Sequence, residues 1–375
     1  MSQTIALILD AYRDLNSRKM FWIVLILSTM VAASFAALRL TPDGFKIFFW
    51  HLHSTVLNSR NISPGDFYKT IFLSYGINFW LTWLATVLAL ISTASLFPDF
   101  LAGGAIDLYL SKPISRLRLF ITKYLCGLLF VALQIGCFCG ASFLVIGWCG
   151  GAWEPGIFLA IPIVVLFYSY LFCFCVLIGV WTRSTVAAVL LTLLFWVFIF
   201  GVHTTEVTLL TFKLTEEDRA ANLDRQMHST QAMLTHYQQV AATRPTTRGS
   251  EYVTMYQTQF DKERSERDEI HGGFDRPQAI FYDVKTVLPK TTETVALLER
   301  ELISKAGLQH VSQVNQENED DSQNSNVELN NRPVPMAKIR AEIRSRSVGW
   351  VVGTSVGFEV VVLGLAAWIF CRRDY

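Results

Sequence analysis

The most unusual ionisable side chain in the sequence is Glu359, because it stands in the middle of an apolar run, 347–371, that is otherwise uncharged. A charged carboxylate at the centre of a bilayer costs about 2.5 to 3.5 kcal/mol on insertion scales, so this side chain should face other helices or be protonated. Two interpretations remain open at this point. Glu359 is either a pathway-lining or proton-responsive group, or a neutral carboxyl hydrogen-bonded to a neighbour such as Gln134 or Asn78. It is our intramembrane functional candidate.

Motifs for nucleotide, hydrolytic or metal chemistry give little support to an enzyme. The phosphate-binding pattern Gly-x-x-x-x-Gly-Lys-Ser/Thr does not occur, so any ATP hydrolysis must belong to another polypeptide. The zinc-protease pattern His-Glu-x-x-His is absent as well. Two Cys-Phe-Cys triplets, 137–139 and 173–175, hold residues that point to different faces of a helix, which favours packing over chelation. We therefore expect no metal site, no bound cofactor and no enzymatic activity in this chain.

The elements that position Glu359 are expected to be membrane spans. Hydrophobic residues make up 52% of the 375-residue chain and charged residues only 17%. Lys plus Arg (32) and Asp plus Glu (31) nearly cancel, which argues against a nucleic-acid partner. A helix needs about 20 apolar residues to cross a bilayer. Six runs satisfy this requirement, and we place the spans at 20–38, 71–97, 125–149, 157–181, 184–203 and within 347–375. The predicted fold is all-α, a six-transmembrane-helix polytopic membrane protein.

The segments outside the spans carry the remaining domain predictions. Residues 2–19 alternate apolar and charged positions at helical spacing, which predicts an amphipathic helix in the membrane interface. Lys and Arg gather beside alternate loops, which places both termini in the cytoplasm and segment 204–346 outside. That segment is predicted to be a helical extracytoplasmic insert. Within it we expect a capping box at Thr215 and Asp218, a helix around Tyr252 and Tyr256, and a helix that runs from 335 into the sixth span without a break. The polar part of the insert, 312–331, is almost wholly Gln, Asn, Ser, Glu and Asp, so it has too few apolar residues to bury and is predicted to be a flexible loop.

The segment between spans two and three, 98–118, has the most ordered pattern of polar residues. Pro98 and Pro113 are expected to bracket a short helix with Asp99 as its N-cap, and Gly103-Gly104 would let its backbone approach a partner closely. Arg116 and Arg118 offer planar charges for an acidic surface, although a cytoplasmic loop of any polytopic protein carries such residues.

This segment resembles the corresponding loop of the membrane subunits of type-2 ABC transporters. There, an acidic turn and a short coupling helix ending in Leu-Ser-Lys/Arg-Pro-x-Ser-Arg precede a Lys-Tyr pair at the third span. The matching residues here are 110–116 and Lys123-Tyr124. The sequence is most similar to permease components labelled for multi-copper enzyme maturation. The resemblance covers 1–203 and 347–375 and leaves the insert aside.

The resemblance implies a permease subunit in the bacterial inner membrane, forming a homodimer among membrane lipids, with ATP and Mg²⁺ bound by a separate ABC ATPase subunit. Export is the expected activity. The alternative is ATP-driven force transmission through the insert to an extracytoplasmic protein, without transport. The residues expected to contact the ATPase are Asp99, Gly103, Gly104, Asp107, Leu110, Lys112, Pro113, Arg116 and Arg118.

Overall fold

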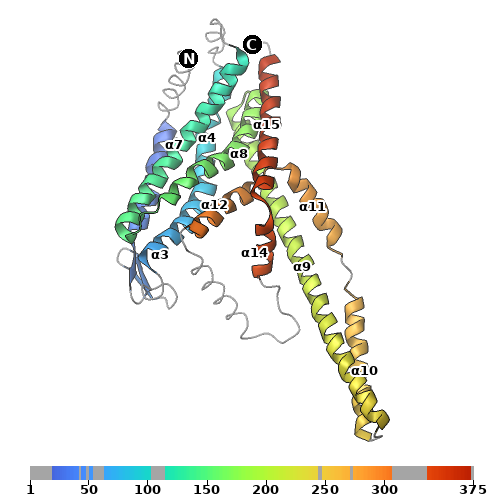
Figure 1. Ribbon diagram of the computed structural model, residues 1–375. Helices are drawn as coiled ribbons and strands as arrows, with labels where there is room; N and C mark the ends of the chain where they lie inside the picture. Colours follow the sequence, from blue (N-terminus) through green and yellow to red (C-terminus); the bar gives the residue numbers. More distant parts are fainter. Residues whose placement is uncertain are drawn as a thin grey trace. The chain divides into compact units, whose positions relative to one another are not determined.

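The computed structural model describes residues 19–41, 44–47, 50–53, 63–102, 115–243, 247–270, 273–305 and 336–372 (Figure 1). The predicted interfacial helix, apart from residue 19, and the predicted flexible loop 312–331 lie outside these ranges. The chain divides into two compact units. The membrane unit comprises 1–200, 286–322 and 348–375, and the hairpin unit comprises 201–285 and 323–347. Each unit is described by itself below.

The membrane unit contains six helical stretches that are long and apolar enough to cross a membrane, which confirms the predicted all-α polytopic fold. They are α2 (Lys19–Ala36), the stretch formed by α3 (Pro64–Ile71), η1 (Phe72–Ala85), α4 (Thr86–Thr93) and α5 (Leu96–Ala102), α7 (Arg116–Gly150), η2 (Pro155–Leu159) with α8 (Ala160–Thr182), the start of α9 (Thr185–Thr243), and α15 (Val348–Arg372). Spans suit helices because a helix satisfies its own backbone hydrogen bonds where no water is present.

A small antiparallel sheet follows α2 and was not predicted. Strands β1 (Leu38–Thr41), β2 (Gly44–Ile47) and β3 (Trp50–His53) pair in the order β1-β2-β3. Leu38 lies opposite Ile47 and Ile47 opposite Trp50. Strands of four residues are too short to show a clear alternation of apolar and polar positions, so the sequence pattern gave no signal for them.

The second span is longer and less regular than expected. It begins at Pro64, where the Ser63 hydroxyl caps the helix by accepting the Asp66 N–H at 3.1 Å. Its middle is a π-helix, η1, and the Thr82 and Thr86 hydroxyls donate to carbonyls five residues back, each at 2.8 Å. π-Helical segments are rare and are found mostly at functional sites.

The prediction that Asp99 caps a short helix is wrong. Asp99 lies inside α5, where its N–H donates to the Ser95 carbonyl at 2.9 Å. The cap in this region is Ser115, whose hydroxyl accepts the Arg118 N–H at 3.4 Å at the start of α7. A cap needs an extended backbone, and Asp99 has already been incorporated into the helix that ends the second span.

The helix that forms the fifth span does not end at residue 203. Helix α9 continues to Thr243, because no Gly or Pro occurs from 202 to 244 to interrupt it. The capping box predicted from Thr215 and Asp218 is therefore wrong, and the Thr215 hydroxyl donates to the Thr211 carbonyl at 2.7 Å within the helix. The apolar length of a span thus predicts where a helix enters the membrane better than where it stops.

In the hairpin unit, the distal part of α9 lies antiparallel to α10 (Thr247–Asp268) (Figure 1). The Tyr237 ring stacks on Tyr252 and Tyr256, with centroids 5.1 and 5.4 Å apart. Arg267 forms a salt bridge with Asp224 at 2.9 Å. The predicted helix around Tyr252 and Tyr256 is confirmed.

Nearer the start of α9, this unit also contains α11 (Asp275–Val287), of which the last two residues belong to the membrane unit, and α14 (Met336–Ser345). A buried ion triad ties these segments to α9: Glu206 is fully buried and accepts hydrogen bonds from Lys285 at 2.8 Å and from Arg346. Helix α14 ends at Ser345, so the predicted unbroken helix from 335 into the sixth span is wrong.

The short helix α12 (Thr291–Lys305) was predicted as part of the insert, but it belongs to the membrane unit. It packs against α8, α15, η1 and η2 (Figure 1). Lys290 precedes it and is 1% exposed. The Lys290 N–H donates to the Ser355 hydroxyl at 2.9 Å, its ammonium donates to the Thr354 hydroxyl, and the Trp350 ring centroid lies 4.1 Å away. These contacts fix the start of α12 on α15.

Two glycines of α7 provide a test of packing in the membrane unit. A Cβ at Gly127 would lie 2.7 Å from the Phe172 ring, whereas a Cβ at Gly140 would have no neighbour within 4 Å. We expect Gly127→Ala to destabilise the protein by about 1 to 3 kcal/mol through overpacking. Gly140→Ala should be neutral or stabilising, since alanine favours helices. Thermal melting of the purified protein in one detergent measures both, and equal melting temperatures for the two variants would contradict the α7 to α8 packing.

Candidate functional site

Glu359 joins three membrane helices through hydrogen bonds. The Tyr124 hydroxyl of α7 donates to Oε1 of Glu359 at 2.8 Å. The Ser169 hydroxyl of α8 lies 2.9 Å from Oε2. Glu359 itself belongs to α15 and is partly buried. The neighbours suggested from the sequence, Gln134 and Asn78, are not its partners. We refer to Tyr124, Ser169 and Glu359 as the carboxyl cluster.

The carboxyl cluster can serve a charged or a neutral carboxyl. The Ser169 hydroxyl is also 2.8 Å from the Leu166 carbonyl, and the Tyr124 hydroxyl is 3.3 Å from the Ser169 carbonyl. As a carboxylate, Glu359 accepts both hydroxyl protons. As a neutral acid it can donate to Ser169, which then keeps its bond to Leu166. Within the described residues Glu359 forms no salt bridge, so hydroxyl groups are what stabilise it there.

An aromatic column leads from this cluster to the second span. Tyr124 stacks on Phe172 with centroids 5.2 Å apart, and Phe172 stacks on Tyr168 at 5.6 Å. The Tyr168 hydroxyl is hydrogen-bonded to Thr93 in α4. Tyr170 is also buried near Glu359, Ser355 and Thr294 of α12. Four of the six spans and α12 therefore meet around the carboxyl cluster.

Lys123, the residue before Tyr124, contacts the coupling segment. We use this name for residues 98–118. Lys123 is buried, and its ammonium lies 5.3 Å from the centroid of Phe100 in α5. Two turns earlier on α7, Arg116 donates to the Cys371 carbonyl at 3.2 Å, near the end of α15. Phe120 contacts Phe370 at 5.6 Å. The first turns of α7 thus bind α5 on one side and α15 on another.

Three of the nine residues predicted to contact an ATPase fall within the described part of the chain. Asp99 is exposed on α5, Arg118 is exposed on the first turn of α7, and Arg116 is partly buried by its contact with α15. Gly103, Gly104, Asp107, Leu110, Lys112 and Pro113 lie outside the described residues. The sequence did not single out Ser169, although it is the one serine in the apolar run of α8.

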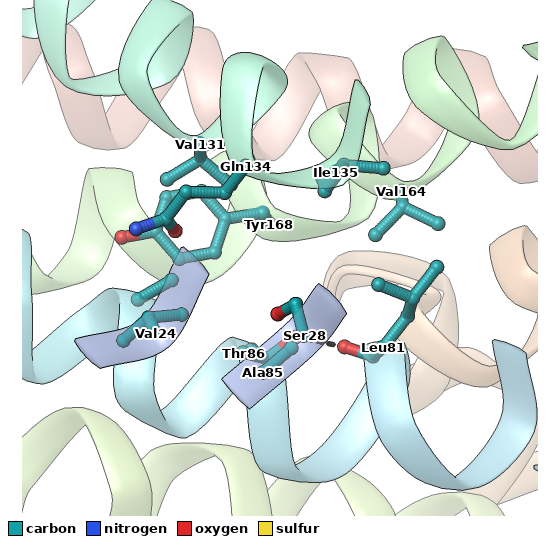
Figure 2. Close-up of a pocket in the computed structure, with 11 residues that line it drawn as sticks. Val24, Ser28, Leu81, Ala85, Thr86, Val131, Gln134, Ile135, Val164 and Tyr168 are labelled. Carbon is teal, nitrogen blue, oxygen red and sulfur yellow. Dashed lines mark hydrogen bonds between the residues drawn. The ribbon is translucent and has the colours of Figure 1, made fainter. Parts of the chain in front are cut away.

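A small cavity lies between α2, the second span, α7 and α8 (Figure 2). Its volume is about 10 Å³, and it is lined by Val24, Ser28, Leu81, Ala85, Thr86, Ala89, Val131, Gln134, Ile135, Val164 and Tyr168. The amide nitrogen of Gln134 is buried there without a hydrogen-bond partner. This cavity has room for about one water molecule, which would satisfy that amide, and is too small for a transported solute.

Residues 353–357 match the Gly-x-Ser-x-Gly pattern of serine hydrolases, but their structure excludes that chemistry. The nucleophile of that motif needs an exposed strand-to-helix turn. Ser355 instead lies in the middle of α15, fully buried, and its hydroxyl donates to the Val351 carbonyl at 2.8 Å while accepting the Lys290 N–H. Ser355 is a contact between α12 and α15.

Comparison with known proteins identifies the class. Residues 12–375 match the family described as ABC-2 family transporter protein, so the chain belongs to that family. It is a multi-pass membrane protein and a permease subunit of an ABC transporter, a role that implies a partner ABC ATPase subunit. No curated protein matches the sequence. No solved structure matches it either.

The carboxyl cluster makes a testable prediction about stability. Glu359→Leu removes one acceptor from each of two buried hydroxyls and leaves them only the Ser169 and Leu166 carbonyls, so we expect a loss of stability of about 1 to 3 kcal/mol. Glu359→Gln keeps one carbonyl acceptor, so we expect it to melt closer to the native protein. Thermal melting in detergent measures both variants. Tyr124→Phe combined with Glu359→Leu should cost less than the sum of the two single changes, because the hydroxyl and its acceptor are removed together. Strict additivity would contradict the Tyr124 to Glu359 hydrogen bond.

Proposed function

We propose that this chain is the permease subunit of an ABC exporter and works as a homodimer in the bacterial inner membrane, with both termini in the cytoplasm. Each copy seats its coupling segment, 98–118, on a separate ATPase subunit that binds ATP and Mg²⁺. Closure of the ATPase subunits on ATP then moves the attached spans. The multi-copper maturation label is carried only by the sequence resemblance and names no substrate here.

One observation supports this proposal above the others: a single helix connects the coupling segment to the intramembrane carboxyl. Helix α7 begins at Arg116 in the coupling segment and carries Tyr124 about two turns further along. A helix is stiff over that length, so a tilt imposed near Arg118 displaces the Tyr124 hydroxyl from Glu359. The same first turns hold the end of α15 through Arg116.

The carboxyl cluster is then the element that responds to the ATPase. Its hydrogen bonds connect α7, α8 and α15, and they must break or follow together when α7 tilts. Breaking them exposes a carboxyl group and two hydroxyls in the interior of the bundle. In an exporter this change would create a polar path in the interior of the bundle, beside the carboxyl cluster.

Force transmission without transport is the alternative function, and α9 is the observation that favours it. The fifth span and the α9 part of the hairpin are one uninterrupted helix, Thr185–Thr243. A rigid-body movement of that span would therefore move the hairpin as well, and an extracytoplasmic partner could receive that movement.

The coupling segment can be tested by charge reversal at Arg118. We expect Arg118→Glu to weaken co-purification of the ATPase and to lower stimulated ATP hydrolysis on the order of tenfold, since an acidic partner surface would be repelled. Lys262→Glu, on the exposed face of α10, is the matched control and should have no effect. The readouts are mass spectrometry of proteins bound to the tagged permease and phosphate release by the purified complex. Equal losses in both variants, or none, would overturn the proposed contact.

Export and force transmission predict different activators of ATP hydrolysis. Stimulation of the reconstituted complex by a lipid or an amphipathic small molecule supports export, whereas stimulation only by an extracytoplasmic protein supports force transmission. Glu359→Gln in the same proteoliposomes tests the carboxyl cluster. If stimulated hydrolysis and transport are both unchanged, Glu359 has no part in the mechanism.

A further inference from the structure

The hairpin formed by α9 and α10 is patterned as an antiparallel coiled coil. The residues that face the other helix recur at alternating steps of three and four, which is the a/d spacing of a heptad. On α9 these are Leu223, Met227, Thr230, Leu234, Tyr237 and Ala241, and on α10 they are Val253, Tyr256, Phe260, Glu263 and Arg267. Within this seam the Thr230 hydroxyl donates to Glu263 at 3.1 Å, which fixes the register of the two helices.

A second apolar surface lies beside that seam, toward the tip of the hairpin. Met233 and Val240 of α9 stand seven residues apart, and Tyr252 of α10 occupies the equivalent flanking position. The register that pairs Thr230 with Glu263 places Val240 at the same height as Tyr252. Met255 lies one turn from Tyr252 on α10. We name Met233, Val240, Tyr252 and Met255 the tip surface.

The tip surface is apolar and exposed, and charged side chains border it on α10: Arg248 stands four residues before Tyr252, and Lys262 stands seven residues after Met255. Its side chains are 50%, 42%, 44% and 50% exposed, in chain order. The next flanking positions toward the membrane end of the hairpin are Gln226 and Gln259, which are polar but carry no charge. The opposite flank of the hairpin has only glutamines at the same heights: Gln231, Gln238 and Gln257. One side of the hairpin therefore differs from the other.

A two-stranded coil needs apolar residues only along its a/d seam. When a flanking position is also apolar, the apolar stripe along the helix becomes wider. A stripe of this width is typical of helices that pack in a bundle of more than two helices. Large apolar side chains at about half exposure on one flank, with glutamines on the other, indicate that additional helices cover that flank. The sequence pattern of the hairpin thus predicts a bundle of more than two helices.

We propose that the tip surface docks against the tip surface of a second copy of this chain, so that the two hairpins form a four-helix bundle. This inference rests on the homodimer in the proposed function, which places both hairpins on the same side of the membrane. When two identical hairpins pack side by side about a two-fold axis that runs along them, equal heights meet, so Val240 meets Tyr252 of the second copy. A surface without charge can meet its own copy without repulsion, which a surface of one sign cannot.

Site-directed cross-linking in native membranes tests this contact. Two differently tagged full-length chains are co-expressed, one carrying Val240→Cys and the other Tyr252→Cys, and the membranes are oxidised. The control pair carries Gln238→Cys and Gln257→Cys, which lie at similar heights on the opposite flank. Native cysteines are common to all samples, so the unsubstituted pair sets the background. We expect on the order of tenfold more reducible mixed-tag dimer from the first pair, because docked surfaces have a high effective concentration.

Adding Met233→Glu to both chains of the first pair should reduce that dimer severalfold, since it introduces a carboxylate into the apolar contact. Gln231→Glu is the matched change on the other flank and should leave the yield unaltered. Equal cross-linking of the two cysteine pairs overturns the inference, as does its absence from both while the tagged copies still co-purify. In either case the homodimer itself survives. Cross-linking of Val240→Cys to a different protein also overturns the inference, and failure of the copies to co-purify overturns the homodimer with it.

Discussion

The hydrogen bonds of one carboxyl group hold the membrane unit together at its centre. In the bilayer interior there is no bulk water to donate hydrogen bonds to Glu359, so its oxygens must accept them from other helices. Tyr124 and Ser169 supply them from α7 and α8, and the stacked rings that follow Tyr124 extend the contact to α4. Three spans are therefore joined directly through this one side chain, and a fourth is joined through the stacked rings and the Tyr168 to Thr93 hydrogen bond.

The sequence allowed the spans to be predicted and Glu359 to be singled out as a candidate, because both follow from the length and polarity of apolar runs. It could not supply the partners of Glu359. A run in which nearly every residue is apolar has no polar face to show its orientation, so Ser169 was indistinguishable from residues that face lipid. Tyr124 stood out only as part of the Lys123-Tyr124 match, which did not indicate that Glu359 is its partner. Gln134 was an equally reasonable partner on sequence grounds, and it lines a separate small cavity instead.

Two of the wrong predictions share one cause, which is that capping signals were read where a helix simply continued. Asp99 and the Thr215 to Asp218 pair have the residue types of N-caps. In both places the preceding residues were already helical, and with no break in the backbone a Thr hydroxyl bonds to the preceding turn instead. The π-helical part of the second span was also beyond prediction, since its residues are ordinary apolar ones.

The placement of α12 changes how the polar region after the fifth span can be removed. In sequence, 204–346 looks like one insertion that could be excised as a block. In the structure that block contains Lys290 and α12, whose contacts with Trp350, Thr354 and Ser355 belong to the membrane unit. Deleting the whole of 204–346 would remove α12 from the helix bundle together with the hairpin. A shortened protein that keeps the bundle intact has to lack only the coiled coil of α9 and α10 and to retain α12, which packs against the spans.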